Sequence, residues 1–164
     1  MSHYLEFETA ANLEADGTAE LFEMVGGTKE QDRSGLMIKQ GQDWGFDVTI
    51  KFKKSGFYNL DGSKIVFRIL LEGMGKATVD VDIPPEEVII NNSNFTYNAA
   101  TATADEYIEL TKEIKVPGST TLEGHYLVVL SITHDAGPKA WGTGKKPAMF
   151  SGFLEMKYVQ FYKE

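Results

Sequence analysis

A strict alternation of apolar and polar residues constrains the fold of this chain more than any other feature. The apolar residues of this stretch are Trp44, Phe46, Val48, Ile50 and Phe52. The residues between them are Gly45, Asp47, Thr49 and Lys51. Successive side chains of a β-strand point to opposite faces, so this period of two predicts a strand with one buried and one solvated face. A helix would scatter the same apolar residues around its circumference.

Similar patterns recur along the chain, separated by turns rich in glycine, proline and asparagine. We expect further strands at 4–9, 19–24, 36–38, 64–72, 77–83, 88–90, 107–116, 126–133 and 152–162. In the last of these, the period of two predicts one shared face for Leu154, Met156, Tyr158 and Tyr162.

Two of these strands carry more specific expectations. The Asp61-Gly62 pair between 44–52 and 64–72 suits a tight reversal of the chain, so we expect those two strands to form a hairpin. The stretch 126–133 is a nearly continuous apolar run, which predicts a central strand covered on both faces.

Many short strands without a fixed repeat predict an all-β fold, an antiparallel β-sandwich of about 8–10 strands. The length of 164 residues suits one domain spanning residues 1–164. The segment Val116-Pro117-Gly118, followed by Gly124-His125-Tyr126-Leu127-Val128, is similar to the corner of immunoglobulin-like and fibronectin-like sandwiches, where a tyrosine enters a central strand. The resemblance implies that type of sandwich, with a jelly-roll-like one as the alternative, and it implies no function.

Composition excludes several classes of function. The net charge of −8 opposes nucleic-acid binding and attachment to an anionic membrane, because both partners are negatively charged. The chain has no cysteine, which excludes disulfides, thiolate zinc sites and a cysteine nucleophile. Neither a signal peptide nor an apolar run of the ~18–20 residues that span a bilayer is visible, so we expect a cytoplasmic protein.

Motifs for catalysis are also missing from the sequence. The nucleophile pattern Gly-x-Ser-x-Gly is absent, and Ser151 lacks the first glycine of that pattern. His125 and His134 are predicted at opposite ends of one strand, roughly 30 Å apart, so they cannot share a proton or a metal. Asp80 and Asp82 share a face and could begin a calcium site, but the sequence supplies no further ligands. We therefore expect no catalytic residue, no metal and no cofactor.

The loop 136–147 is the strongest candidate for a binding site in the sequence. It places Trp141 among Lys139, Lys145 and Lys146, the main basic cluster of an acidic chain. Exposed tryptophans stack on sugars or anchor protein interfaces, so we predict that these four residues contact a ligand or a partner. The alternative is that Trp141 folds back and caps the end of the core.

Charge segregation suggests self-association as one such contact. Residues 1–43 carry nine acidic and three basic side chains, so a basic loop on one copy could meet an acidic region on another. The sequence thus favours a non-enzymatic binding or structural assembly module that contacts another protein or forms a homo-oligomer. A lectin-like, carbohydrate-binding module that uses Trp141 and exposed tyrosines is the first alternative. An enzyme without a readable motif is the second.

Overall fold

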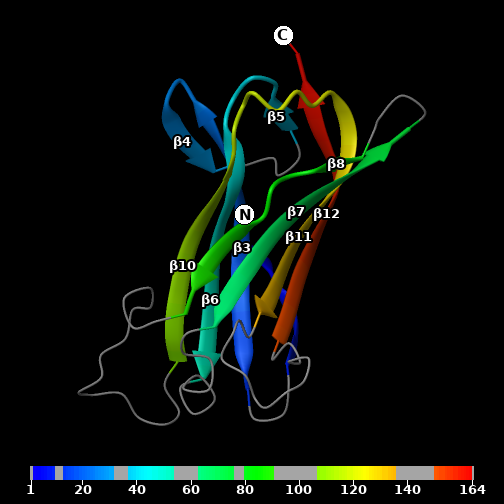
Figure 1. The fold of residues 1–164 in the computed structure, drawn as a ribbon. Coiled ribbons are helices and arrows are strands. Elements are labelled where there is room, and N and C mark those ends of the chain that lie inside the picture. The colour runs from blue at the N-terminus through cyan, green and yellow to red at the C-terminus, as the bar shows by residue number, and fades with distance from the viewer. Residues whose placement is uncertain are drawn as a thin grey trace.

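The computed structural model describes residues 2–9, 13–31, 37–53, 63–75, 80–90, 107–135 and 150–163. Within these ranges the chain forms strands and turns and no helix, so the predicted all-β class is confirmed (Figure 1). The first six strands are β1 (Ser2–Tyr4), β2 (Glu6–Thr9), β3 (Ala15–Val25), β4 (Thr28–Gln31), β5 (Met37–Lys39) and β6 (Trp44–Lys53). The next six are β7 (Lys64–Met74), β8 (Val81–Asp82), β9 (Glu86–Ile89), β10 (Tyr107–Val116), β11 (Gly124–Asp135) and β12 (Phe150–Tyr162).

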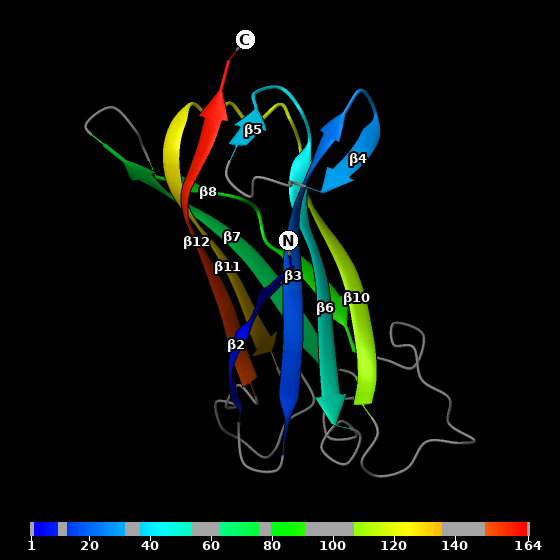
Figure 2. The same ribbon diagram turned by 180° about the vertical axis from the view of Figure 1, so that it is seen from behind.

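These strands form two sheets that lie in separate layers. The five-stranded sheet has the order β1-β3-β6-β10, with β4 also paired to β3. The seven-stranded sheet has the order β2-β12-β11-β7-β8, with β5 on β12 and β9 on β7. Every pair is antiparallel except β5 with β12. In both views the layer of β3, β6 and β10 faces the layer of β7, β11 and β12 (Figures 1 and 2).

One hydrophobic core fills the space between the two layers, with buried side chains from both sheets. The five apolar residues of the alternating stretch all lie in this core, at 0–2% exposure, on β6. The strand and its buried face are therefore as predicted. Trp44 packs edge-on against Phe161 of β12, with ring centroids 5.2 Å apart, which joins one sheet to the other.

The predicted strand 4–9 is two strands that belong to different sheets. β1 pairs with β3, whereas β2 pairs with β12. The change occurs at Leu5, whose amide donates a hydrogen bond to the carbonyl of Gly17, 3.0 Å away. An added Cβ at Gly17 would lie 3.0 Å from the Leu5 side chain and 2.7 Å from the carbonyl oxygen of Thr49. Glycine at this position therefore lets the N-terminal strand pass closely from one layer to the other.

The predicted hairpin between 44–52 and 64–72 is wrong. β6 pairs with β3 and β10 in the five-stranded sheet, whereas β7 lies in the seven-stranded sheet next to β11. The β6–β10 and β7–β11 ladders run along nearly whole strands, so long-range pairing outweighs the local turn signal. Asp61-Gly62 lies outside the described residues.

The strand at 126–133 is central but is not covered on both faces. β11 pairs with β12 on one edge and β7 on the other. Its burial alternates, with Val128 and Leu130 buried and Leu127 and Val129 half-buried. The apolar run therefore supplies the core on one side and a partly solvated apolar surface on the other. Tyr126 is buried and packs edge-on against Phe161.

A β-bulge changes the predicted face of the last strand. Tyr126 pairs with Val159, but Val128 pairs with Met156, so one residue of β11 opposes two of β12. The extra residue reverses the alternation beyond this point. Leu154 and Met156 are buried as predicted, and Val159 and Phe161 follow them into the core, whereas Tyr162, expected there, is only half-buried. The side chain of Tyr158 lies outside the described part of the structure.

Candidate functional site

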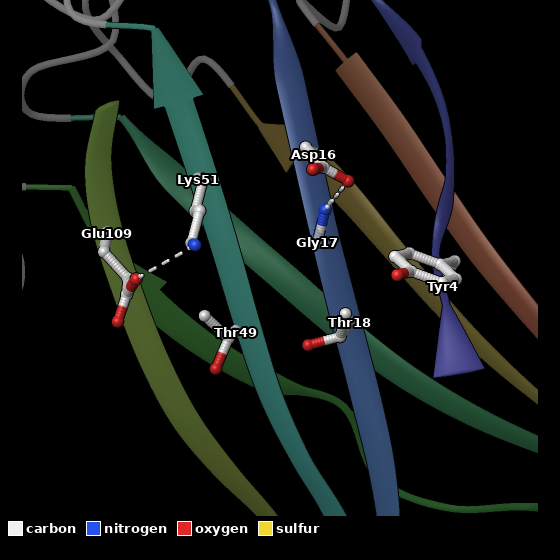
Figure 3. Close-up of a pocket in the computed structure, with 7 residues that line it drawn as sticks. All are labelled: Tyr4, Asp16, Gly17, Thr18, Thr49, Lys51 and Glu109. Atoms are coloured by element: carbon white, nitrogen blue, oxygen red, sulfur yellow. Dashed lines mark hydrogen bonds and ion pairs between the residues drawn. The ribbon is translucent and has the colours of Figure 1, made fainter. Parts of the chain in front are cut away.

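The outer face of the five-stranded sheet carries a surface depression of about 370 Å³. Its lining comes from four strands and consists of Tyr4, Asp16, Gly17, Thr18, Thr49, Lys51 and Glu109 (Figure 3). Apart from Gly17, these residues occupy the solvated positions of β1, β3, β6 and β10. The depression therefore lies on the polar face that the alternation at 44–52 predicts for β6.

Strand register arranges the lining in two rows. In the first row Tyr4 is opposite Thr18, and Thr18 is opposite Thr49. In the second, Asp16 is opposite Lys51, and Lys51 is opposite Glu109. Neighbouring strands lie about 4.8 Å apart and alternate residues of one strand about 6.8 Å apart, so the two rows form a small grid of side chains.

Tyr4 forms one wall of the depression. Its side chain is 78% exposed, although a phenol ring gains stability from burial. The ring lies beside β3, on the same side of the sheet as Thr18 (Figure 3). Its strand is anchored where Leu5 bonds to Gly17, so the ring has a supported position at the edge of the polar grid.

The polar groups of the lining have unused hydrogen-bonding capacity. Asp16 uses Oδ1 to accept a bond from the Gly17 amide, 2.7 Å away, and Oδ2 has no partner among the residues that the structure describes. Lys51 Nζ and Glu109 Oε2 are 3.8 Å apart, an ion pair longer than a hydrogen bond. Among the described residues, the hydroxyls of Thr18 and Thr49 have no hydrogen-bond partner. The depression therefore offers both donors and acceptors to a ligand.

Further along the same face of the sheet, charged side chains are joined in ion pairs. Lys29 of β4 lies over the ring of Phe22, 4.2 Å from its centroid, and bonds to Asp47 at 2.6 Å and Glu113 at 2.7 Å. Burial opposes the charge of Lys29, but its hydrogen bonds to the two carboxylates raise its pKa above the usual value. Lys29 is therefore a hydrogen-bond partner of both carboxylates at this end of the face.

A buried histidine lies within the molecule, away from this face. His134 Nε2 is 2.8 Å from Ser63 Oγ, and the two residues are 5% and 6% exposed. The ring of His134 also packs against Phe150, with centroids 5.4 Å apart. A serine–histidine contact resembles a nucleophile with its base. A nucleophile must be accessible to its substrate, and Ser63 Oγ is buried together with His134. The pair is therefore better explained as a structural hydrogen bond in the interior.

This histidine predicts a pH dependence of stability. Burial lowers the pKa of His134 below 6.5, and the neighbouring Asp135 charge opposes that shift only in part. Below about pH 6.5 the unfolded chain binds a proton that the folded state does not, so stability falls by up to about 1.4 kcal/mol per pH unit. Above that pH the side chain is neutral in both states, so His134 causes no loss of stability there.

Urea unfolding of the wild type and of His134→Gln between about pH 7.5 and 5.5 measures this effect. Glutamine can still hydrogen-bond to Ser63 but does not titrate, so the variant should lose less stability on acidification than the wild type does. Equal losses in the two proteins would show that His134 is not the group responsible.

The site residues predicted from sequence fall mostly outside the described structure. Trp141, Lys139, Lys145 and Lys146 all lie beyond the described ranges, and their proposed role stays a prediction. His125 and His134 belong to one strand as predicted, with His125 exposed and His134 buried.

Asp80 and Asp82 lie at β8, where Asp82 pairs with Leu70 of β7. Asp80 Oδ1 accepts a hydrogen bond from the Gly73 amide at 2.9 Å, so its carboxylate fastens the chain to the end of β7. Within the described part of the chain, no group of three or more acidic or histidine side chains is placed to hold a metal ion.

Sequence reasoning missed the depression because its residues are far apart in the chain. Tyr4 and Glu109 are brought together only by the β1–β3–β6–β10 order, which no local pattern reveals. The only relevant pattern in the sequence was the solvated face of 44–52, where Thr49 and Lys51 alternate with core residues. This alternation predicts that both side chains are solvent-exposed, but it does not predict which residues of other strands lie beside them.

Comparisons with known proteins add no relative. No protein-family model matches the chain, and a search of curated proteins also found no match. In the part of the chain that the structure describes, no helix is long and apolar enough to cross a bilayer.

Proposed function

We propose that the protein is a non-enzymatic binding module whose ligand occupies the depression beside Tyr4. The observation that carries the proposal is an exposed aromatic ring next to polar side chains with unused hydrogen-bonding capacity. Small-molecule sites combine an apolar contact surface with a few placed polar groups in this way. The volume of about 370 Å³ falls at the lower end of the roughly 300–1,000 Å³ typical of such sites.

The position of the site on paired strands supports this proposal. Thr18 and Thr49 belong to β3 and β6, which are hydrogen-bonded on both edges along this region. Their inward neighbours Ala19, Val48 and Ile50 are buried in the core. Side chains held on such strands need little ordering when a ligand binds, which favours affinity.

For the type of fold, we propose a β-sandwich of the immunoglobulin/fibronectin-like or jelly-roll-like kind. Two facing sheets with a common core support a sandwich, and the buried Tyr126 at the start of β11 supports the resemblance to a tyrosine corner. This assignment concerns architecture and adds nothing to the choice of ligand.

Self-association is a second candidate function, and it is favoured by a different surface. Leu70, Met74 and Phe153 are 39–41% exposed on strands of the seven-stranded sheet. Leu70 is opposite the half-buried Val129 on β11, so the exposed carbons extend into an apolar area. Such areas often cover one another in homo-oligomers. Contacts through Trp141, Lys139, Lys145 and Lys146 are a separate route to the same outcome.

The binding proposal predicts the behaviour of Tyr4→Ala. A ligand that binds the native state raises the melting temperature, so we expect neutral oligosaccharides, short peptides or nucleosides to do so for the wild type. Because Tyr4 is exposed, Tyr4→Ala should melt within about 2 °C of the wild type, as surface substitutions usually do. It should nevertheless lose the shift caused by the stabilising compound.

Thermal melting of both proteins against the three compound classes is the measurement, and Tyr4→Phe is the matched control because it keeps the ring. A compound that stabilises the wild type and Tyr4→Ala equally would place its site elsewhere. The absence of any shift in the wild type across all three classes would contradict a binding function at this depression.

A further inference from the structure

We infer that the ligand of the depression is a neutral carbohydrate, held by stacking on Tyr4 and by hydrogen bonds to the polar grid beside it. This inference rests on the proposed function, because it names the class of ligand for the same site. Three properties of the lining support it: its alternating charges, the paired backbone of β3 and β6, and its combination of one aromatic ring with several polar groups.

The charges of the lining select against ionic ligands. Asp16 and Glu109 flank Lys51 in one cross-strand row, so each sign lies next to its opposite. An anion at Lys51 would meet two carboxylates, and a cation at either carboxylate would meet the ammonium group. Like charges at such distances are unfavourable. A neutral ligand with many hydroxyls avoids these costs and can still bond to all three side chains.

The strands β3 and β6 form the floor of the depression, and their backbone hydrogen-bonding groups are already paired with neighbouring strands. β3 pairs with β1 and β6 at this point, and β6 pairs with β3 and β10. An extended peptide usually binds a sheet by adding a strand to an open edge, which β3 and β6, each paired on both edges, do not provide. A ligand that lies over β3 and β6 must therefore be recognised through side chains.

The side chains of the floor match the chemistry of a sugar ring. A pyranose has an apolar face of C–H groups and a rim of hydroxyls that both donate and accept hydrogen bonds. Tyr4 supplies an aromatic surface for the first, and Thr18, Thr49 and Asp16 supply partners for the second. Tyr4 and Thr49 are separated by two strand spacings, about 10 Å, which leaves room for a ring between them.

A matched pair of threonines tests the inference. Thr49 lines the depression, whereas Thr111 is its exposed cross-strand neighbour on β10 and is not part of the lining. Valine replaces the hydroxyl of threonine by a methyl group of similar size. Thr49→Val should weaken binding of the best neutral oligosaccharide about fivefold, the value of one hydrogen bond, and Thr111→Val should leave it unchanged.

Calorimetric titration of both variants, of Tyr4→Ala and of Tyr4→Phe provides the affinities. The probes are gluco-, galacto-, manno- and xylo-configured oligosaccharides. We expect Tyr4→Ala to lose about tenfold in affinity and Tyr4→Phe to stay within about twofold of the wild type, because the ring is the contact.

Equal effects of the two threonine substitutions would overturn the inference, and so would a wild type that binds none of these sugars. If peptides or nucleosides then gave a thermal shift that Tyr4→Ala abolishes, the proposed function would stand and the carbohydrate assignment alone would fall. If no compound gave such a shift, both would fall.

Discussion

Gly45→Ala is expected to destabilise the protein by about 3 kcal/mol or more, although alanine normally suits a strand better than glycine by roughly 0.5–1 kcal/mol. Gly45 lies in β6 opposite Lys115 of β10. A Cβ at this position would clash with the carbonyl oxygen of Ile114 and lie 3.0 Å from its carbonyl carbon. Both atoms belong to the backbone, so the β6–β10 ladder itself would have to move.

Gly152→Ala is the matched control for this prediction. Its Cβ would meet ring carbons of Phe7 at 2.5 and 2.7 Å, and a side chain can rotate away more easily than a backbone can shift. Chemical denaturation should therefore show a smaller loss for Gly152→Ala than for Gly45→Ala. Equal losses, or a Gly45→Ala protein as stable as the wild type, would contradict the close approach of the two strands.

Phe46→Ala is expected to lower the free energy of unfolding by about 3–5 kcal/mol, the usual cost of removing a buried phenyl ring. Phe46 has no exposed surface and lies in the core shared by the two sheets. Its ring lies against that of Trp44, with centroids 6.4 Å apart, so the cavity would open beside the largest core side chain. Urea unfolding measures the loss.

Lys51→Ala on the same strand is the control for Phe46→Ala. Lys51 is on the solvated face and its contact with Glu109 is a long surface ion pair, so its removal should change stability by no more than about 0.5 kcal/mol. A Phe46→Ala loss as small as that of Lys51→Ala would mean that the buried and solvated faces of β6 had been assigned the wrong way round.

Local alternation was enough to predict the faces of single strands. The core residues of β6 and the wet positions of Thr49 and Lys51 follow from a period of two, which depends only on nearby residues. The same rule failed in β12, because one extra residue at the bulge reversed the alternation for Val159 and Phe161. A bulge is set by the partner strand, which the local sequence does not contain.

The pairing of strands could not be predicted from the chain alone. β7 follows β6 directly in the chain, and the sequence between them contains an Asp-Gly pair typical of a turn, yet the two strands belong to different sheets. The candidate site depends on this pairing, because β1, β3, β6 and β10 each supply part of its lining. Sequence analysis pointed to Trp141 instead, because Trp141 and the lysines around it are close together in the sequence, whereas the residues of the depression are not.

The contact between Lys112 and Glu86 also depends on tertiary structure. Lys112 lies between Leu110 and Ile114 on the apolar face of β10, and the sequence alone does not explain a charged side chain at this position. In the structure Lys112 Nζ lies 2.9 Å from Glu86 of β9, and β9 belongs to the other sheet. The ion pair therefore connects the two layers beside β10. A charge at such a position also discourages pairing with a strand from another molecule.

Amide chemical-shift mapping of ¹⁵N-labelled protein, titrated with the neutral oligosaccharide that binds best, locates the ligand on the protein. If the ligand binds the outer face of the five-stranded sheet beside Tyr4, the largest shifts should occur at Tyr4, 16–18, 49–51 and Glu109, with little change at Thr111 or on the seven-stranded sheet. Shifts confined to 136–149, or to Leu70, Met74 and Phe153, would place the ligand elsewhere and refute a site beside Tyr4.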